Sequence, residues 1–95
     1  MTVEFEWDDA NESHIAEHGV TPEEAEEVFF DPSRATIDVY STATERRRGL
    51  VGRTEDGRLL FVVYTRRAGA IRIVTALDAT ASQERRYRRA VRRKT

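Results

Sequence analysis

The sequence has 95 residues, enough for one domain, and its 39% hydrophobic and 35% charged residues are typical of a globular protein rather than a disordered or fibrous one. It contains no cysteine, which excludes disulfides and thiolate chemistry. The formal net charge of −1 conceals a division along the chain: residues 1–31 hold 11 Asp or Glu and no Lys or Arg, whereas residues 32–95 hold 16 Lys or Arg against 6 Asp or Glu.

The first residues lack the basic-then-apolar pattern of a signal peptide. The longest apolar run, Leu59–Tyr64, is far shorter than the ~20 residues that span a bilayer. The sequence therefore predicts a cytoplasmic protein that does not contact a membrane, with residues 1–95 forming a single domain.

The first third of the chain predicts a short strand and two helices. Residues 3–7 alternate apolar side chains with glutamates, the period of a half-buried strand. Asp8 is placed to cap a helix that runs to about residue 18. Thr21-Pro22-Glu23-Glu24 begins a second helix, because Thr21 caps it, proline fits its first turn and Glu24 completes a capping box. That helix is expected to end at Asp31-Pro32.

The rest of the chain predicts four strands and a final helix. Extended segments are expected near residues 35–40, 46–54, 58–66 and 71–76, separated in the second half by glycine-containing turns. Thr80, with Gln83 in the box position, caps a helix that runs through the arginine-rich end. The order β-α-α-β-β-β-β-α predicts an α+β fold in which helices pack on a four-stranded antiparallel sheet.

Arginines surround the final helix and leave only Tyr87, Ala90 and Val91 as an apolar stripe. Their charge either pairs with the acidic first third or forms a nucleic-acid surface, which we favour because arginine's planar fork suits phosphate contacts and because the predicted sheet adds further arginines. Tyr64 and Tyr87 either stack on bases or belong to the core. The arginines are Arg85, Arg86, Arg88, Arg89, Arg92 and Arg93 on the helix, and Arg46, Arg47, Arg48, Arg53, Arg58, Arg66, Arg67 and Arg72 before it.

His14 and His18 lie four residues apart with Glu17 between them, which is the inverted zinc-protease pattern. Zinc needs a third protein ligand, which the glutamates of the following helix could supply. The favoured alternative for the two histidines is a packing or hydrogen-bonding role near Trp7, and the third is an acid–base role or contact with a partner. Among the other carboxylates, Glu45 and Asp78 have no local structural explanation and are candidate acid–base groups.

Three separated groups of segments, read together, resemble the BrnT family of toxins. The resemblance covers almost the whole chain at matching spacing. The opening is carried by Phe5-Glu6-Trp7-Asp8, residues 18–25 and Val28-Phe29-x-Asp31-Pro32. The centre is carried by Glu45-Arg46, Gly52-Arg53-Thr54, residues 57–60 and 62–66, and the end by residues 71–76, Ala79-Thr80 and Glu84-Arg85-Arg86-Tyr87.

This resemblance implies a RelE-like fold and a metal-independent endoribonuclease, without cofactor, that cleaves mRNA and so inhibits translation and growth. It also implies a BrnA-like partner antitoxin with a ribbon-helix-helix domain, through which alone the toxin would reach operator DNA. Two departures stand out: Leu77 where the family usually has arginine, and Asn11 and His14 where many members have lysine and asparagine. They keep open a second function, that of a non-catalytic module that binds antitoxin or nucleic acid and acts as co-repressor.

Cleavage of RNA without metal needs a base for the 2′-hydroxyl, charge stabilisation at the phosphorane and an acid for the 5′-oxygen. We assign the scissile phosphate to Arg66, Arg72, Arg85 and Arg86, with Tyr87 nearby for stacking or proton transfer. The base is Glu45, His14 or His18. Further RNA contacts are assigned to Arg53, Arg58, Arg88 and Arg89, and the acidic helices are expected to face away from the RNA.

Overall fold

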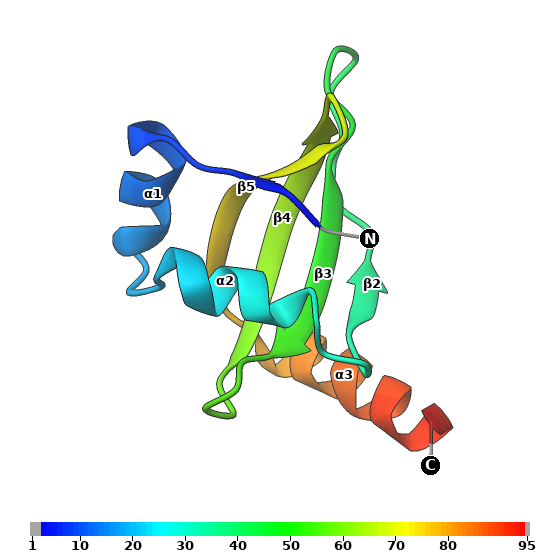
Figure 1. Ribbon diagram of the computed structural model, residues 1–95. Coiled ribbons are helices and arrows are strands. Elements are labelled where there is room, and N and C mark those ends of the chain that lie inside the picture. Colours follow the sequence, from blue (N-terminus) through cyan, green and yellow to red (C-terminus); the bar gives the residue numbers. More distant parts are fainter. Residues whose placement is uncertain (1–2, 95) are drawn as a thin grey trace.

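The computed structural model describes residues 3–94, so residues 1, 2 and 95 of the predicted domain lie outside it (Figure 1). Its elements, in chain order, are β1 (Phe5–Glu6), α1 (Asp9–Ala16), α2 (Pro22–Val28), β2 (Ala35–Ile37), β3 (Arg48–Arg53), β4 (Leu59–Arg67), β5 (Ala70–Asp78) and α3 (Ala81–Lys94). The predicted order of elements and the α+β class are confirmed. Both early helices end sooner than predicted, at Ala16 and Val28, and β2 is only three residues long.

The sheet is mixed and five-stranded, in the order β1-β5-β4-β3-β2, which corrects the prediction of four antiparallel strands. Strands β2 to β5 are antiparallel as predicted, but β1 adds to the edge of β5 in parallel, with Phe5 opposite Ile71 and Glu6 opposite Arg72. Without β1 that edge would present unpaired backbone groups. The alternation of residues 3–7 predicted the strand itself, but the local pattern cannot identify a partner strand more than sixty residues away.

Helices cover both faces of the sheet (Figure 1). Leu50 and Val51 are neighbours on β3 and point to opposite faces, as successive strand residues must. Leu50 belongs to the larger core cluster, beneath α1 and α2, and Val51 packs with Tyr87 of α3. The larger cluster consists of Ile15, Val20, Ala25, Val28, Leu50, Leu60, Val62, Tyr64, Ile71, Ile73 and Ala76. Among the described residues no helix has the length and apolar character to cross a membrane.

The predicted helix starts are confirmed because they depend on local chemistry. The Thr21 hydroxyl accepts from the Glu24 N–H while Glu24 accepts from the Thr21 N–H, and Thr80 and Gln83 exchange the same pair of bonds. Asp8 caps α1 with Asn11 as its box partner. Each cap fixes the residue at which its helix begins and therefore which side chains of the helix face the sheet.

Two glycines allow close packing around β3. A Cβ on Gly52 would lie 2.8 Å from Cγ1 of Val28, so this glycine lets the end of α2 rest against the strand. A Cβ on Gly49 would lie 2.5 Å from the carbonyl oxygen of Ile37 and 2.7 Å from Cγ1 of Val39. The segment that leads from β2 to β3 is therefore held tightly against the start of β3.

Candidate nucleic-acid interface

Arg72 joins the acidic N-terminus to the last strand. Its Nη1 donates to Glu6 Oε1 at 3.0 Å and to Asp8 Oδ2 at 2.9 Å, and only 15% of its side chain is exposed. The hydrogen bond from Arg72, helped by the Asn11 N–H, lowers the pKa of Asp8, and the same bond raises the pKa of Arg72. Glu6 also lies 3.8 Å from Arg67. Arg72 therefore connects β1 and the start of α1 to β5.

Arg58 has a similar bridging position at the other end of β5. Its Nε donates to Asp78 Oδ1 at 2.8 Å, and its Nη1 donates to the carbonyl oxygen of Gly19 at 2.8 Å and to Glu24 at 3.3 Å. The pKa of Glu24 is lowered first by the Thr21 N–H and then by Arg58. Asp78, a predicted acid–base candidate, is thus the ion-pair partner of Arg58.

Tyr87 anchors α3 to the sheet. Its hydroxyl donates to Asp31 Oδ2 at 2.7 Å, and the same carboxylate accepts from the N–H groups of Ser33 and Arg53, both at 2.8 Å. Burial raises the pKa of Asp31, but these hydrogen bonds outweigh it and leave that pKa below its ordinary value. Burial, followed by the bond to Asp31, raises the pKa of Tyr87.

Both predicted stacking tyrosines are buried. Tyr87 is 3% exposed, with the Arg53 guanidinium 5.6 Å from the centre of its ring. Tyr64 packs edge-on against Phe29, with ring centres 5.0 Å apart. Of the two roles that the sequence left open for these rings, the structure shows the core role.

Glu45 lies in an arginine-rich surface that we call the Glu45 site, formed by two adjoining pockets at the end of the sheet where the β4–β5 turn lies. One, of about 340 Å³, is lined by Ala10, Asn11, His14, Glu45, Arg47, Arg67, Arg72, Ile73 and Val74. The other, of about 360 Å³, is lined by Thr44, Glu45, Arg46, Arg48, Thr65, Arg66 and Arg67. Glu45 and Arg67 line both pockets, and Glu45 accepts from Arg47 Nε at 3.3 Å.

The structure brings Glu45, Arg66 and Arg72 together at this end, along with His14. It does not bring the predicted partners on α3 to the same place. Strand β3 begins next to the Glu45 site and ends at Arg53, beside Tyr87, so the sheet separates them (Figure 1). On α3, Arg85, Arg88 and Arg89 are exposed and Arg86 is half-buried, and Arg88 pairs with Glu84 at 3.2 Å.

The two histidines lie edge to face, with ring centres 5.4 Å apart, and His14 Nδ1 is 3.6 Å from Glu17. Within residues 3–94, no three or more His, Cys, Asp or Glu side chains are grouped so as to hold a metal ion. The third ligand that the zinc hypothesis requires is therefore not in place there. Trp7 donates its indole N–H to Glu26 of α2, at 2.7 Å.

The importance of Asn11 could not be predicted from composition alone. Its side chain is 4% exposed, and its amide N–H groups donate to the carbonyl oxygens of Glu6 and Ile73, each at 3.0 Å. Its Oδ1 accepts from the Asp8 N–H at 2.8 Å. The sequence offered one signal for it: Asn11 lies three residues after the cap residue Asp8 and four before the buried Ile15, which puts it on the face of α1 that meets the sheet.

Residues 7–83 match the family described as the ribonuclease toxin BrnT of type II toxin–antitoxin systems. The matched range contains every residue that lines the Glu45 site and ends in the first turn of α3, before its arginines. No curated protein matches the chain. The match spans most of the chain and agrees with the resemblance drawn from its motifs. This chain therefore belongs to the BrnT family of ribonuclease toxins, whose type II systems pair each toxin with a cognate antitoxin.

Proposed function

We propose that this protein is a RelE-like toxin that cleaves mRNA in the cytoplasm without a metal ion and so arrests translation and growth. The observation that carries the proposal is the Glu45 site, where a carboxylate lies within a cluster of arginines that could hold a phosphate. The cognate antitoxin is proposed to be a BrnA-like ribbon-helix-helix protein that neutralises the toxin and carries it to operator DNA.

Glu45 is the proposed general base. Its side chain lines both pockets, so a phosphate held in either brings a neighbouring 2′-hydroxyl within its reach. Arginine, with a pKa above 12, is a poor base but a strong donor to the charge that develops on the phosphorane. Arg66 and Arg67 are exposed at this site and supply that charge. His14, which also lines the first pocket, is the proposed acid for the leaving 5′-oxygen.

The other arginines divide into two groups. Arg58 and Arg72 are positioning residues, because carboxylates already occupy them and they act through the elements that they join. The exposed arginines Arg85, Arg88 and Arg89 on α3 bind the RNA backbone away from the cleaved bond, where phosphate contacts add affinity without chemistry. Arg86, which is half-buried, and Arg53, whose guanidinium lies over the Tyr87 ring, are proposed to support that surface.

The test compares the unaltered chain with Glu45→Gln and Arg66→Ala, assayed on purified RNA in the presence of a chelator and by growth after induction without antitoxin. Each substitution should lower the cleavage rate by a factor of about 10² or more, because it removes the base or a donor to the phosphorane. Asp56→Asn, in the β3–β4 turn, is the matched control that should leave cleavage unchanged.

Cleavage that persists in both Glu45→Gln and Arg66→Ala would refute the assignment of the site. Cleavage that disappears with the chelator and returns with a divalent ion would refute the metal-independent reaction.

One observation favours the alternative of a non-catalytic co-repressor. Leu77, at the position where the family usually has arginine, is half-buried on β5 opposite Phe61, on the side of the sheet that α3 partly covers. Leu77 therefore adds to the apolar surface at a position where an arginine would bind phosphate. If the unaltered chain leaves RNA intact but binds its antitoxin and strengthens repression of the shared operon, this alternative holds.

A further inference from the structure

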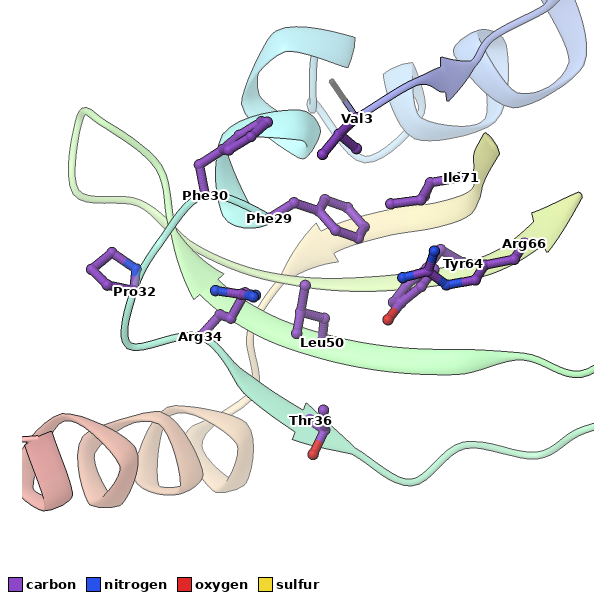
Figure 2. A pocket seen from close by; sticks show the side chains of 10 residues that line it. All are labelled: Val3, Phe29, Phe30, Pro32, Arg34, Thr36, Leu50, Tyr64, Arg66 and Ile71. Carbon is purple, nitrogen blue, oxygen red and sulfur yellow. The ribbon is translucent and has the colours of Figure 1, made fainter. Parts of the chain in front are cut away.

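Phe30 is the centre of an apolar surface that the fold leaves uncovered. Among the described large apolar side chains the exposed ones are Val3, at 45%, Phe30, at 63%, and Tyr40, at 85%. Val3 and Phe30 line one pocket of about 430 Å³ (Figure 2). Clustered apolar exposure of this kind marks a binding surface more often than single exposed residues do. The pocket is lined by Val3, Phe29, Phe30, Pro32, Arg34, Thr36, Leu50, Tyr64, Arg66 and Ile71.

The charges around this pocket are cationic. Figure 2 shows Arg34 and Arg66 reaching in from opposite sides, with Leu50 between them and Tyr64 next to Arg66. The described residues that line it include no Asp or Glu. The pocket therefore suits an apolar group that carries a negative charge beside it.

A second pocket, of about 350 Å³, shares Phe30 and Pro32 with the first and has the opposite character. Glu27, Asp31 and Glu55 line it, together with Arg53 and Thr54. Phe30 thus forms a ridge between a cationic pocket and a carboxylate-rich one. We call Phe30 and these two pockets the Phe30 surface.

This alternation of charge favours a protein over RNA. A nucleic acid has a negative charge at every phosphate, so the carboxylates beside Phe30 would repel the strand that the arginines attract. A polypeptide can present an acidic, an apolar and a basic side chain in succession and satisfy all three parts of the surface. An apolar anchor ringed by charge is also the usual form of an energetic centre in a protein interface.

We propose that the Phe30 surface is the docking site of the cognate antitoxin. The docking segment places an apolar side chain against Phe30, a carboxylate between Arg34 and Arg66, and a lysine or arginine against Glu27 and Glu55. This inference rests on the proposed function, in which the chain is a toxin with such a partner.

Arg66 gives the docking a direct consequence. It lines the pocket beside Phe30 and also the second pocket of the Glu45 site. A carboxylate of the antitoxin that pairs with Arg66 therefore removes one of the cations proposed to hold the scissile phosphate. The antitoxin neutralises the toxin by occupying a shared arginine, without covering the whole RNA surface.

The experiment measures binding of the purified protein encoded by the neighbouring reading frame to the full chain, by titration calorimetry. The variants are Phe30→Ser and Arg34→Glu, whose side chains are exposed and lie outside the proposed catalytic set. Each should weaken antitoxin binding about tenfold or more, as loss of an interface anchor does, and raise the antitoxin concentration needed to stop cleavage by the same factor. Cleavage by the free variants should equal that of the unaltered chain.

Tyr40→Ser and Arg93→Glu are the matched controls, since they change an exposed aromatic residue and an exposed arginine elsewhere. They should leave antitoxin affinity within about twofold. The proposal is overturned if Phe30→Ser and Arg34→Glu bind antitoxin as the unaltered chain does, or if the neighbouring protein does not bind the unaltered chain. It is also overturned if these two variants instead lose affinity for a labelled single-stranded RNA, which would assign the surface to RNA.

The two proposals fail separately. A chain that cleaves no RNA but shows the expected pattern of antitoxin affinities refutes the nuclease and supports the docking site. If the unaltered chain cleaves RNA but Phe30→Ser and Arg34→Glu bind antitoxin as tightly as it does, the docking site is refuted and the nuclease proposal stands.

Discussion

Single side chains help to attach the helices to the rest of the fold, and on α3 Tyr87 does so through its bond to Asp31. Tyr87 is the largest residue of the apolar stripe of α3, and its hydroxyl ends on a carboxylate that two backbone N–H groups also hold. A hydrogen bond to a charged group stabilises a fold more than a neutral one does.

Tyr87→Phe keeps the ring and removes only this bond, so it should lower the free energy of unfolding by about 1–2 kcal/mol. Tyr40→Phe, at an 85% exposed tyrosine, is the matched control and should change it little. Urea titrations of both variants at neutral pH give the measurement. Equal losses in the two variants would contradict the anchoring role.

Because both Tyr87 and Asp31 titrate, the free energy of unfolding that is lost in Tyr87→Phe depends on pH. The pKa of Asp31 is lowered from 3.8 in the fold, so its contribution is present above pH 3.8 and falls as the pH drops through the folded value. The pKa of Tyr87 is raised from 10.0, so its contribution is complete below pH 10.0 and is lost as the pH rises through the higher folded value. The difference between the parent chain and Tyr87→Phe should therefore be constant between these limits and shrink outside them.

At the scale of elements, α2 rests on β3 through Gly52 and Val28. A methyl group at position 52 would lie 2.8 Å from Cγ1 of Val28 and 3.1 Å from its carbonyl oxygen, and the backbone at the end of a helix cannot yield cheaply. Gly52→Ala should therefore destabilise the protein by about 1–3 kcal/mol, the usual cost of overpacking a core.

A double-mutant cycle tests the cause. Val28→Ala alone should lower the free energy of unfolding by about as much as other deletions of buried methyl groups, because Val28 is fully buried. In Gly52→Ala/Val28→Ala the new methyl group has room where Cγ1 was, so the pair should cost less than the sum of the single changes. Thermal unfolding of the three variants measures this coupling, and strict additivity would exclude the contact as the reason.

Elements defined by local chemistry could be predicted from the sequence, and elements defined by distant partners could not. The caps at Thr21 and Thr80 involve residues three apart, and both are present. The pairing of β1 with β5 was missed because two residues carry too little pattern to identify a strand 66 positions away. The α1 cap at Asp8 was predicted, but the long-range bonds of Asn11 to the sheet were not.

The candidate site shows the same limit. The sequence identified Glu45 and Arg66, which the fold brings to one end, but it grouped them with Arg85, Arg86 and Tyr87, which the sheet separates from them. Burial of Tyr87 and the ion pairs of Arg58 and Arg72 depend on residues 20 to 66 positions away. A charge count along the chain cannot say which arginines are already paired.

For the whole molecule, Arg58 and Arg72 of the basic remainder pair with carboxylates of the acidic third, whereas Arg85 and Arg89 of α3 have exposed side chains. RNA binding by the Glu45→Gln variant should weaken as salt rises, because phosphate contacts release counterions. Replacing Arg85, Arg88 and Arg89 with alanine should reduce the magnitude of the slope of log K against log salt by about 2. Each phosphate contact on a single strand contributes roughly 0.7 to that slope. Fluorescence anisotropy at several salt concentrations measures it, and an unchanged slope would remove α3 from the RNA surface.

The attachment of the N-terminal segments to β5 also sets an order of events in folding. Glu6 bonds to Arg72, 66 positions away, and Asn11 bonds to Ile73, 62 positions away, so these attachments of β1 and α1 cannot form until β5 exists. Contacts this far apart in the chain form late and slow the folding of a small domain. Among the elements of residues 3–94, β5 is the last strand that the ribosome makes, and α3 follows it. The Glu45 site draws on residues from Ala10 to Val74, so it cannot exist on a nascent chain that lacks β5.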